Sequence, residues 1–278
     1  MIILSEIRRA VEKVRYLQSC SRASRSLALK PANQEWFHAL HGDLWAHAGG
    51  GRFHLYGNSQ EAFDDAIASG FSILEADVMM TLDNVPVMSH RFRPNFEVEF
   101  DSTPTVSQFL ARKINGKYTP MTLEMFIGRY ENRGVYVAID PSPSLRSRFG
   151  SAHILDYLKC HASEDFQRHV IYQISGVKDM ALFAHTEWLG ALHYNLNHDI
   201  SCPENAWRVD ALIPALKAVG VGSVSYVDMP VTPSLVSAVS KFNEAGILVS
   251  VASVNSIERF NRLKKIGVSC IDTDYCYP

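Results

Sequence analysis

The chain has 278 residues, of which 47% are hydrophobic and 20% are charged, and its formal net charge is −2. This length and composition suit one domain with a large core, and the balanced charge argues against a dedicated nucleic-acid binder. The five cysteines are scattered without a CxxC pair, which argues against a disulfide framework or a thiolate metal site. No apolar run is long enough to cross a bilayer and no secretory leader is evident, so a cytoplasmic location is expected.

The N-terminal segment differs from the rest, because residues 1–30 hold seven Lys/Arg against two Glu. Its apolar residues recur at helical spacing and predict an amphipathic helix over residues 3–22 with a basic outer face: Ile3, Ile7, Val11 and Val14. We expect residues 1–40 to form a helical segment packed on a single domain made of residues 41–278. The alternative is peripheral contact between this basic helix and an anionic membrane.

Short apolar runs then alternate with helical patterns. The predicted strands are residues 43–47, 72–78, 135–140, 169–174, 191–195, 222–227, 247–252 and 268–273. The predicted helices are residues 59–69, 121–132, 147–161, 178–188, 207–219, 233–245 and 255–266. Eight strands separated by helices predict an α/β fold, the parallel (β/α)8 TIM barrel. Residues 85–90 would form an extra strand that returns in a hairpin from the second barrel strand.

No helix is predicted after the eighth strand, although a helix normally lies between the last strand and the first. We expect the N-terminal helix, residues 3–22, to replace it. Its apolar residues would then face the barrel.

The stretch from His47 to His90 gathers polar residues at one end of this barrel. Glu75 and Asp77 interrupt an apolar strand and, being two residues apart, project from the same face. Two such carboxylates are costly to bury unless a cation offsets their charge, and oxygen ligands suit Mg²⁺ or Ca²⁺ better than zinc. The alternative is one acid in a salt bridge and the other at a solvated strand end. The flanking histidines favour the metal site.

The same stretch resembles the glycerophosphodiester phosphodiesterase family, which shares its barrel and site with phosphatidylinositol phospholipase C and sphingomyelinase D enzymes. The resemblance rests on the order His-x-Gly, Asn-Ser, Glu-x-Asp and Thr-x-Asp-x-x-x-Val-x-x-His. The matching residues are His47, Gly49, Asn58, Ser59, Glu75, Asp77, Thr81, Asp83, Val87 and His90. The resemblance is weaker at Thr122 to Glu124 and at residues 135–140. It is clear again near the end of the sequence, at Thr273-Asp274.

This resemblance implies a metal-dependent phosphodiester hydrolase on a TIM barrel. One divalent cation, Mg²⁺ or Ca²⁺, would be held by Glu75, Asp77 and Asp140. His47 and His90 would carry protons from the attacking hydroxyl and to the leaving oxygen, by way of a cyclic phosphate that water then opens.

Two alternatives stay open. One is a lyase or transferase of the same superfamily, which stops at the cyclic phosphate or passes the phosphoryl group to another alcohol. The other is a non-catalytic barrel that binds phosphodiesters. The substrate is expected to be a small-molecule, lipid or polymer phosphodiester, with its head group undetermined.

The sequence departs from the family at two phosphate-binding positions. Ala48 stands where the family has an arginine, and Ser142 stands where it has a lysine. Arg52 and Arg91 lie in nearby loops and are candidates to restore the positive charge, since arginine binds phosphate oxygens bidentately.

Three further polar residues are candidates for substrate or phosphate contact at the barrel mouth. Asn58 begins the helix after the first strand. His193 and Asn195 share one face of the fifth strand. For these last two residues the alternative is hydrogen bonding within the barrel rim.

Overall fold

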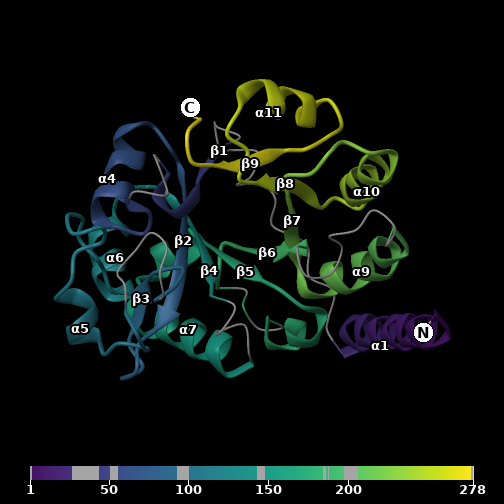
Figure 1. Ribbon diagram of the computed structural model, residues 1–278, viewed down its shortest axis with the longest axis horizontal. Coiled ribbons are helices and arrows are strands. Elements are labelled where there is room, and N and C mark those ends of the chain that lie inside the picture. The colour runs from purple at the N-terminus through teal and green to yellow at the C-terminus, as the bar shows by residue number, and fades with distance from the viewer. Residues whose placement is uncertain are drawn as a thin grey trace.

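The computed structural model describes residues 2–26, 44–50, 56–92, 100–142, 148–183, 186, 188–196, 206–276 and 278. Its centre is a closed barrel in which eight strands run parallel, as the sequence predicted (Figure 1). The strand order is β1-β9-β8-β7-β6-β5-β4-β2, and pairing of β1 with β2 closes the barrel. The ninth strand, β3, pairs antiparallel with β2 on the outside and is the expected hairpin return.

The strands fall where the apolar runs placed them. Their bounds are β1 Leu44–Ala46, β2 Ile73–Met80, β3 Pro86–Met88, β4 Tyr136–Pro141, β5 Val170–Ile174, β6 Ala191–Asn195, β7 Val221–Val227, β8 Leu248–Ala252 and β9 Cys270–Thr273. Such runs are typical of parallel strands that are covered on both faces.

The helices surround the barrel, and several begin at a side-chain cap that satisfies a free backbone N–H group. They are α4 Gln60–Ala68, α6 Leu123–Tyr130, α7 Arg148–His161, α9 Ala206–Val219, α10 Pro233–Glu244 and α11 Ile257–Lys264, with two short helices, α5 Val106–Leu110 and α8 Glu164–Arg168. The two short helices were not predicted. The helix expected over 178–188 is instead a 3₁₀ helix, η2, over Val177–Phe183.

The two faces of the barrel strands have different partners. Outward residues such as Val137 and Val224 belong to a large core shared with the helices. Inside, at the beginning of the strands, six buried residues form an apolar plug: Trp45, Ile73, Ala138, Ile171, Ala191 and Cys270. Because side chains alternate along a strand, residues two and four positions beyond the plug also face inward, toward the carboxyl end. Polar groups there lie above an apolar floor.

Helix α1 spans Ile2–Ser26 and packs against α9 and η2. In Figure 1 it lies beside α9, on the opposite side of the barrel from β1 and β9. The expectation that it lies between the last and first strands is therefore wrong. Val11 and Val14 were expected against the barrel but are exposed, and the side chains of Ile3 and Ile7 lie outside those described. Among the side chains of this helix that the structure describes, residues 10–23, Cys20 and Ala23 are buried.

Within the described residues, no helix is long and apolar enough to cross a membrane.

Candidate metal and acid-base site

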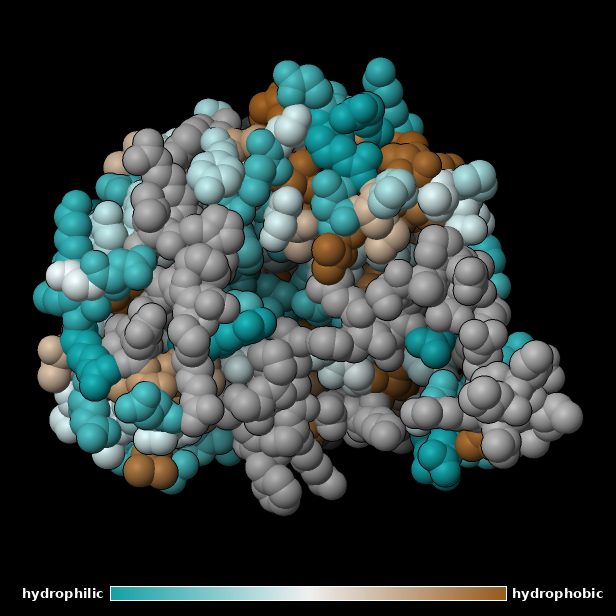
Figure 2. Space-filling model, in the orientation of Figure 1, coloured by the Kyte–Doolittle hydropathy of each residue, from teal (hydrophilic) through white to brown (hydrophobic). Residues whose placement is uncertain are grey.

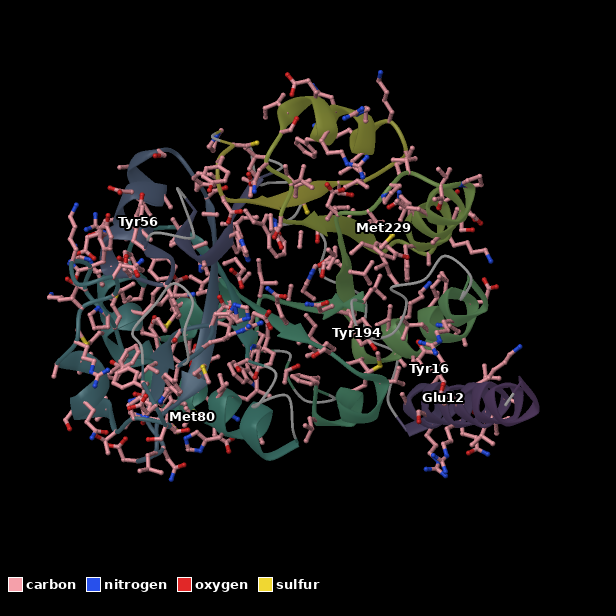
Figure 3. All side chains as sticks on the ribbon, viewed as in Figure 1. Glu12, Tyr16, Tyr56, Met80, Tyr194 and Met229 are labelled. Carbon is pink, nitrogen blue, oxygen red and sulfur yellow. The ribbon has the colours of Figure 1, made fainter. Side chains whose placement is uncertain are left out.

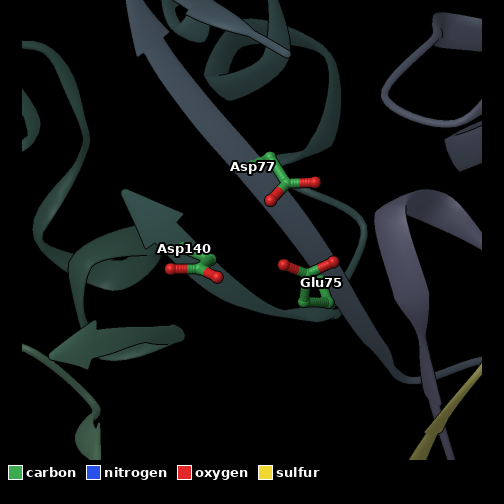
Figure 4. A group of neighbouring side chains, drawn as sticks. All are labelled: Glu75, Asp77 and Asp140. Carbon is green, nitrogen blue, oxygen red and sulfur yellow. The ribbon is translucent and has the colours of Figure 1, made fainter. Parts of the chain in front are cut away.

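Three carboxylates converge at the carboxyl end of the barrel (Figure 4). Glu75 and Asp77 project from the inner face of β2, and Asp140 projects from β4, where it pairs in register with Asp77. One oxygen of each residue lies within 4.8 Å of the other two. The strands thus bring together the three residues predicted as metal ligands.

The electrostatics of this cluster fit a divalent cation. Burial, together with the negative charges of Asp77 and Asp140, raises the pKa of Glu75 well above its usual value. A hard cation would reverse this cost, because it favours the ionised form of all three ligands. An all-oxygen donor set of this kind suits Mg²⁺ or Ca²⁺.

Asn58 fixes the orientation of Asp77. Its amide nitrogen donates to Asp77 Oδ2 at 2.9 Å, and its amide oxygen accepts from the Asp77 backbone N–H at 3.0 Å. The side chain is fully buried, and both of its polar ends contact Asp77. Its role as a substrate contact stays a prediction, and the structure shows that Asn58 supports a carboxylate that is a candidate metal ligand.

A short 3₁₀ turn, η1 His47–Gly49, positions the first histidine. Ala48 adopts a left-handed conformation with φ 48°, and its backbone N–H donates to Glu75 Oε2 at 2.7 Å. Gly49, with φ +88°, allows the turn to approach α4, since a Cβ there would lie 2.9 Å from the Cβ of Ala62. The turn therefore joins His47 to the carboxylate cluster through the backbone.

His47 is held by Asp274, whose role was not predicted. The His47 Nδ1 and Asp274 Oδ1 atoms are 2.8 Å apart. The other carboxylate oxygen of Asp274 accepts from Asn255 Nδ2 at 2.8 Å, and Asn255 Oδ1 accepts from the Asp274 N–H at 2.8 Å. Burial lowers the pKa of His47, but the hydrogen bond to Asp274 and the charge of Glu75 outweigh it and raise that pKa to about 10.

The second predicted histidine, His90, follows β3. The preceding residue, Ser89, donates its backbone N–H to the carbonyl oxygen of Asp77 at 3.0 Å. His90 is half-buried and is thus tethered beside β2. Arg91, next in the chain, is exposed, and Arg52 lies outside the described residues.

His193, a predicted substrate contact, lies deep in the barrel, so its substrate role stays a prediction and the contacts observed are within the protein. It is fully buried, its Nδ1 is 2.7 Å from Ser223 Oγ, and its ring packs 5.1 Å from that of Trp45 in the apolar plug. Burial lowers the pKa of His193 to about 3, so the ring is neutral. Asn195, two residues further along the same inner face, is nearer the mouth and is slightly exposed.

One further acid faces the barrel interior. Asp272 follows Cys270 by two residues, so it projects from the same inner face as the plug. Burial raises the pKa of Asp272 to about 7, and the negative charges of Asp140 and Asp274 add to the rise. The charge of His47 opposes it. Asp272 was not among the predicted site residues.

Figure 2 shows a hollow at the centre of this face of the molecule, and hydrophilic side chains are visible inside it. At the two positions where the family resemblance expected phosphate-binding cations, Ala48 and Ser142 are buried. Neither side chain can supply a positive charge.

A family profile described as "Glycerophosphoryl diester phosphodiesterase family" matches residues 47–276. Among curated proteins, no sequence matches the chain.

Solved structures share the fold. A phosphodiesterase from Oleispira antarctica, in complex with the product sn-glycerol-3-phosphate, is 18% identical with a TM-score of 0.66, covering 86% of this chain and 95% of its own. A glycerophosphodiester phosphodiesterase from Parabacteroides distasonis is 19% identical, with a TM-score of 0.62 and coverage of 83% and 92%. One from Thermotoga maritima is 19% identical, with a TM-score of 0.60 and coverage of 84% and 95%.

Proposed function

This chain belongs to the glycerophosphoryl diester phosphodiesterase family, whose members are phosphoric diester hydrolases, and from that premise we propose that it is a metal-dependent enzyme acting on a glycerophosphodiester-like substrate. The observation that carries the proposal is the convergence of Glu75, Asp77 and Asp140 within 4.8 Å of one another. When bound there, Mg²⁺ or Ca²⁺ would offset the charge of the carboxylates and of the phosphodiester.

The protein's own groups would transfer the protons. Asp274 engages Nδ1 of His47, and in this proposal the other ring nitrogen, Nε2, exchanges the proton with the substrate. Asn255 holds Asp274 in place, so the ring of His47 cannot turn without breaking its hydrogen bond to a fixed carboxylate. His90 would act as the partner in general acid-base catalysis, one histidine taking the proton of the attacking hydroxyl and the other protonating the leaving oxygen.

The test is a panel of phosphodiesters assayed after chelation and re-addition of each divalent ion. Wild type should be inactive without the ion. Asp77→Asn and His47→Ala should each lose roughly 10²-fold or more in kcat. Asp210→Asn, which removes an exposed acid paired with Lys241 on the outer helices, should retain full activity. Full activity of chelated wild type would defeat metal dependence.

A second candidate is a reaction that stops at a cyclic phosphate. Ser142, in place of the lysine that the resemblance expects near the phosphate, favours it, because a buried serine offers less charge to the second, water-dependent step. Phosphorus NMR of a substrate with a vicinal hydroxyl, run in heavy-oxygen water, separates the two outcomes. A cyclic product that persists indicates a lyase, and an unlabelled cyclic species followed by labelled monoester indicates a hydrolase.

A further inference from the structure

Helix α1 carries an apolar stripe on the side that faces away from the barrel. Val11, Val14 and Leu17 recur every three residues, so they share one face of the helix. They are 42%, 53% and 39% exposed. On the described part of the chain, exposed apolar residues in such a row form a patch with no partner from the fold.

The opposite face of α1 is the one that binds the barrel. Cys20 and Ala23 are buried, and Tyr16 packs against the same core. Tyr16 points from α1 toward α9, where the Arg208 guanidinium carbon lies 5.2 Å from the centre of its ring (Figure 3). The anchored face thus leaves the stripe turned outward.

Basic residues border the stripe on both sides. At 100° per residue, Lys13 falls beside Leu17, whereas Arg15 and Arg22 fall beside Val11, and all three basic residues are exposed. Between Ile2 and Ser26 there are six Lys/Arg against two Glu, a net charge of +4 in a chain whose net charge is −2. Positive charge is therefore concentrated on the helix that presents the apolar stripe.

We propose that the Val11–Val14–Leu17 stripe of α1 and its basic borders form a docking surface for an anionic membrane. Apolar side chains flanked by Lys and Arg are what a helix lying in the headgroup region requires: the stripe enters the acyl boundary and the cations meet anionic lipids. A second copy of this chain could also cover the stripe, but charge argues against it, because two helices of net charge +4 would repel each other. The stripe has no aromatic anchor, so docking is reversible and salt-sensitive.

The test is co-sedimentation of the full chain with vesicles, which reads binding and not catalysis. Wild type should pellet with phosphatidylcholine vesicles that contain about a third phosphatidylserine, but not with pure phosphatidylcholine. Raising the salt from about 0.05 to 0.5 M should weaken binding roughly 10-fold. The triple variant Val11→Ser/Val14→Ser/Leu17→Ser should weaken it at least 10-fold, and Lys13→Gln/Arg15→Gln should abolish the preference for anionic vesicles.

A matched control removes three exposed apolar residues from other helices. Met125→Ser/Val236→Ser/Ile257→Ser, at positions 42%, 38% and 46% exposed, should bind vesicles as wild type does. Thermal melts establish that both triple variants fold. Equal pelleting of wild type and the α1 triple variant overturns the proposal. The proposal is also overturned if sedimentation equilibrium shows that wild type is a dimer and the α1 triple variant is a monomer. The stripe would then bind a second copy of the chain.

Discussion

The hydrogen bonds of Asn58 show how single residues prepare the site. A buried carboxylate with one fixed orientation binds a metal better than one that must be ordered first. Asn58, at φ 60°, is also in the left-handed region, which asparagine tolerates better than most residues. Asn58 therefore has two roles: it tolerates the left-handed backbone conformation, and its side chain holds Asp77.

We predict that Asn58→Ala lowers affinity for the divalent ion roughly 10- to 100-fold, because Asp77 loses its bidentate partner. Titration calorimetry measures the effect. Asn84→Ala is the control, since Asn84 has the same φ of 60° in an exposed turn. It should cost similar backbone strain and leave metal affinity unchanged. A loss of affinity in both variants would mean that strain, and not the side-chain contact, is responsible.

Asp274 offers a second test at this scale. Asp274→Asn keeps the shape of the side chain but removes the charge that favours protonated His47. We expect kcat to fall about 10- to 100-fold and the pH profile attributed to His47 to move to lower pH, with metal affinity nearly unchanged. Kinetics across pH measure this shift. An unchanged profile would show that Asp274 does not set the basicity of the histidine.

At the scale of elements, η1 and α4 are in close contact beside the site. Gly49→Ala would place a Cβ 2.9 Å from the Cβ of Ala62, at a backbone φ of +88° that alanine adopts at a cost. We predict a loss of at least about 1–2 kcal/mol in the free energy of unfolding, together with weaker metal binding, because Ala48 no longer reaches Glu75.

The control for that change is Gly134→Ala, where φ is +65° but no atom lies within 4 Å of the new Cβ. Urea denaturation should show a smaller loss, about 1 kcal/mol from backbone strain alone. If the two variants lose equal stability and keep equal metal affinity, close approach of η1 to α4 is not required.

Strand periodicity explains why the barrel could be predicted. Apolar runs mark the strands, and the two-residue spacing of Glu75 and Asp77 sets their common face. The same rule put His193 and Asn195 on the inner face. It could not say that His193 lies deep beside the plug, because depth depends on the stagger between strands.

Other parts of the site depend on contacts that no local pattern encodes. Asp274 and His47 are 227 positions apart, and only closure of β1 against β9 brings them together. The terminal Thr273-Asp274 motif was the available signal. The place of α1 was missed for a related reason: its buried face is made partly of small residues, Cys20 and Ala23, which contribute little to an apolar pattern.

At the scale of the whole molecule, acids that are buried above the apolar plug make the free energy of unfolding depend on pH. Asp272 is buried, and its pKa rises from 3.8 to about 7 on folding. The folded state therefore holds more protons than the unfolded state between these values. Unfolding free energy must fall as pH rises through that window, by up to about 1.4 kcal/mol per pH unit from this group. Glu75, whose pKa is also raised, acts in the same direction.

We predict that Asp272→Asn flattens part of this dependence, since an amide resembles the protonated carboxyl and does not ionise. Urea denaturation of the metal-free protein between about pH 4 and 7 should show the variant gaining stability over wild type as pH rises, with the two curves parallel above about pH 7. Asp210→Asn, at an exposed position paired with Lys241, should keep the wild-type slope. Added Mg²⁺ or Ca²⁺ should stabilise wild type more at pH 7 than at pH 4, because the ion competes with protons for Glu75 and its neighbours. Parallel curves for wild type and Asp272→Asn throughout would show that this carboxyl stays ionised in the folded barrel.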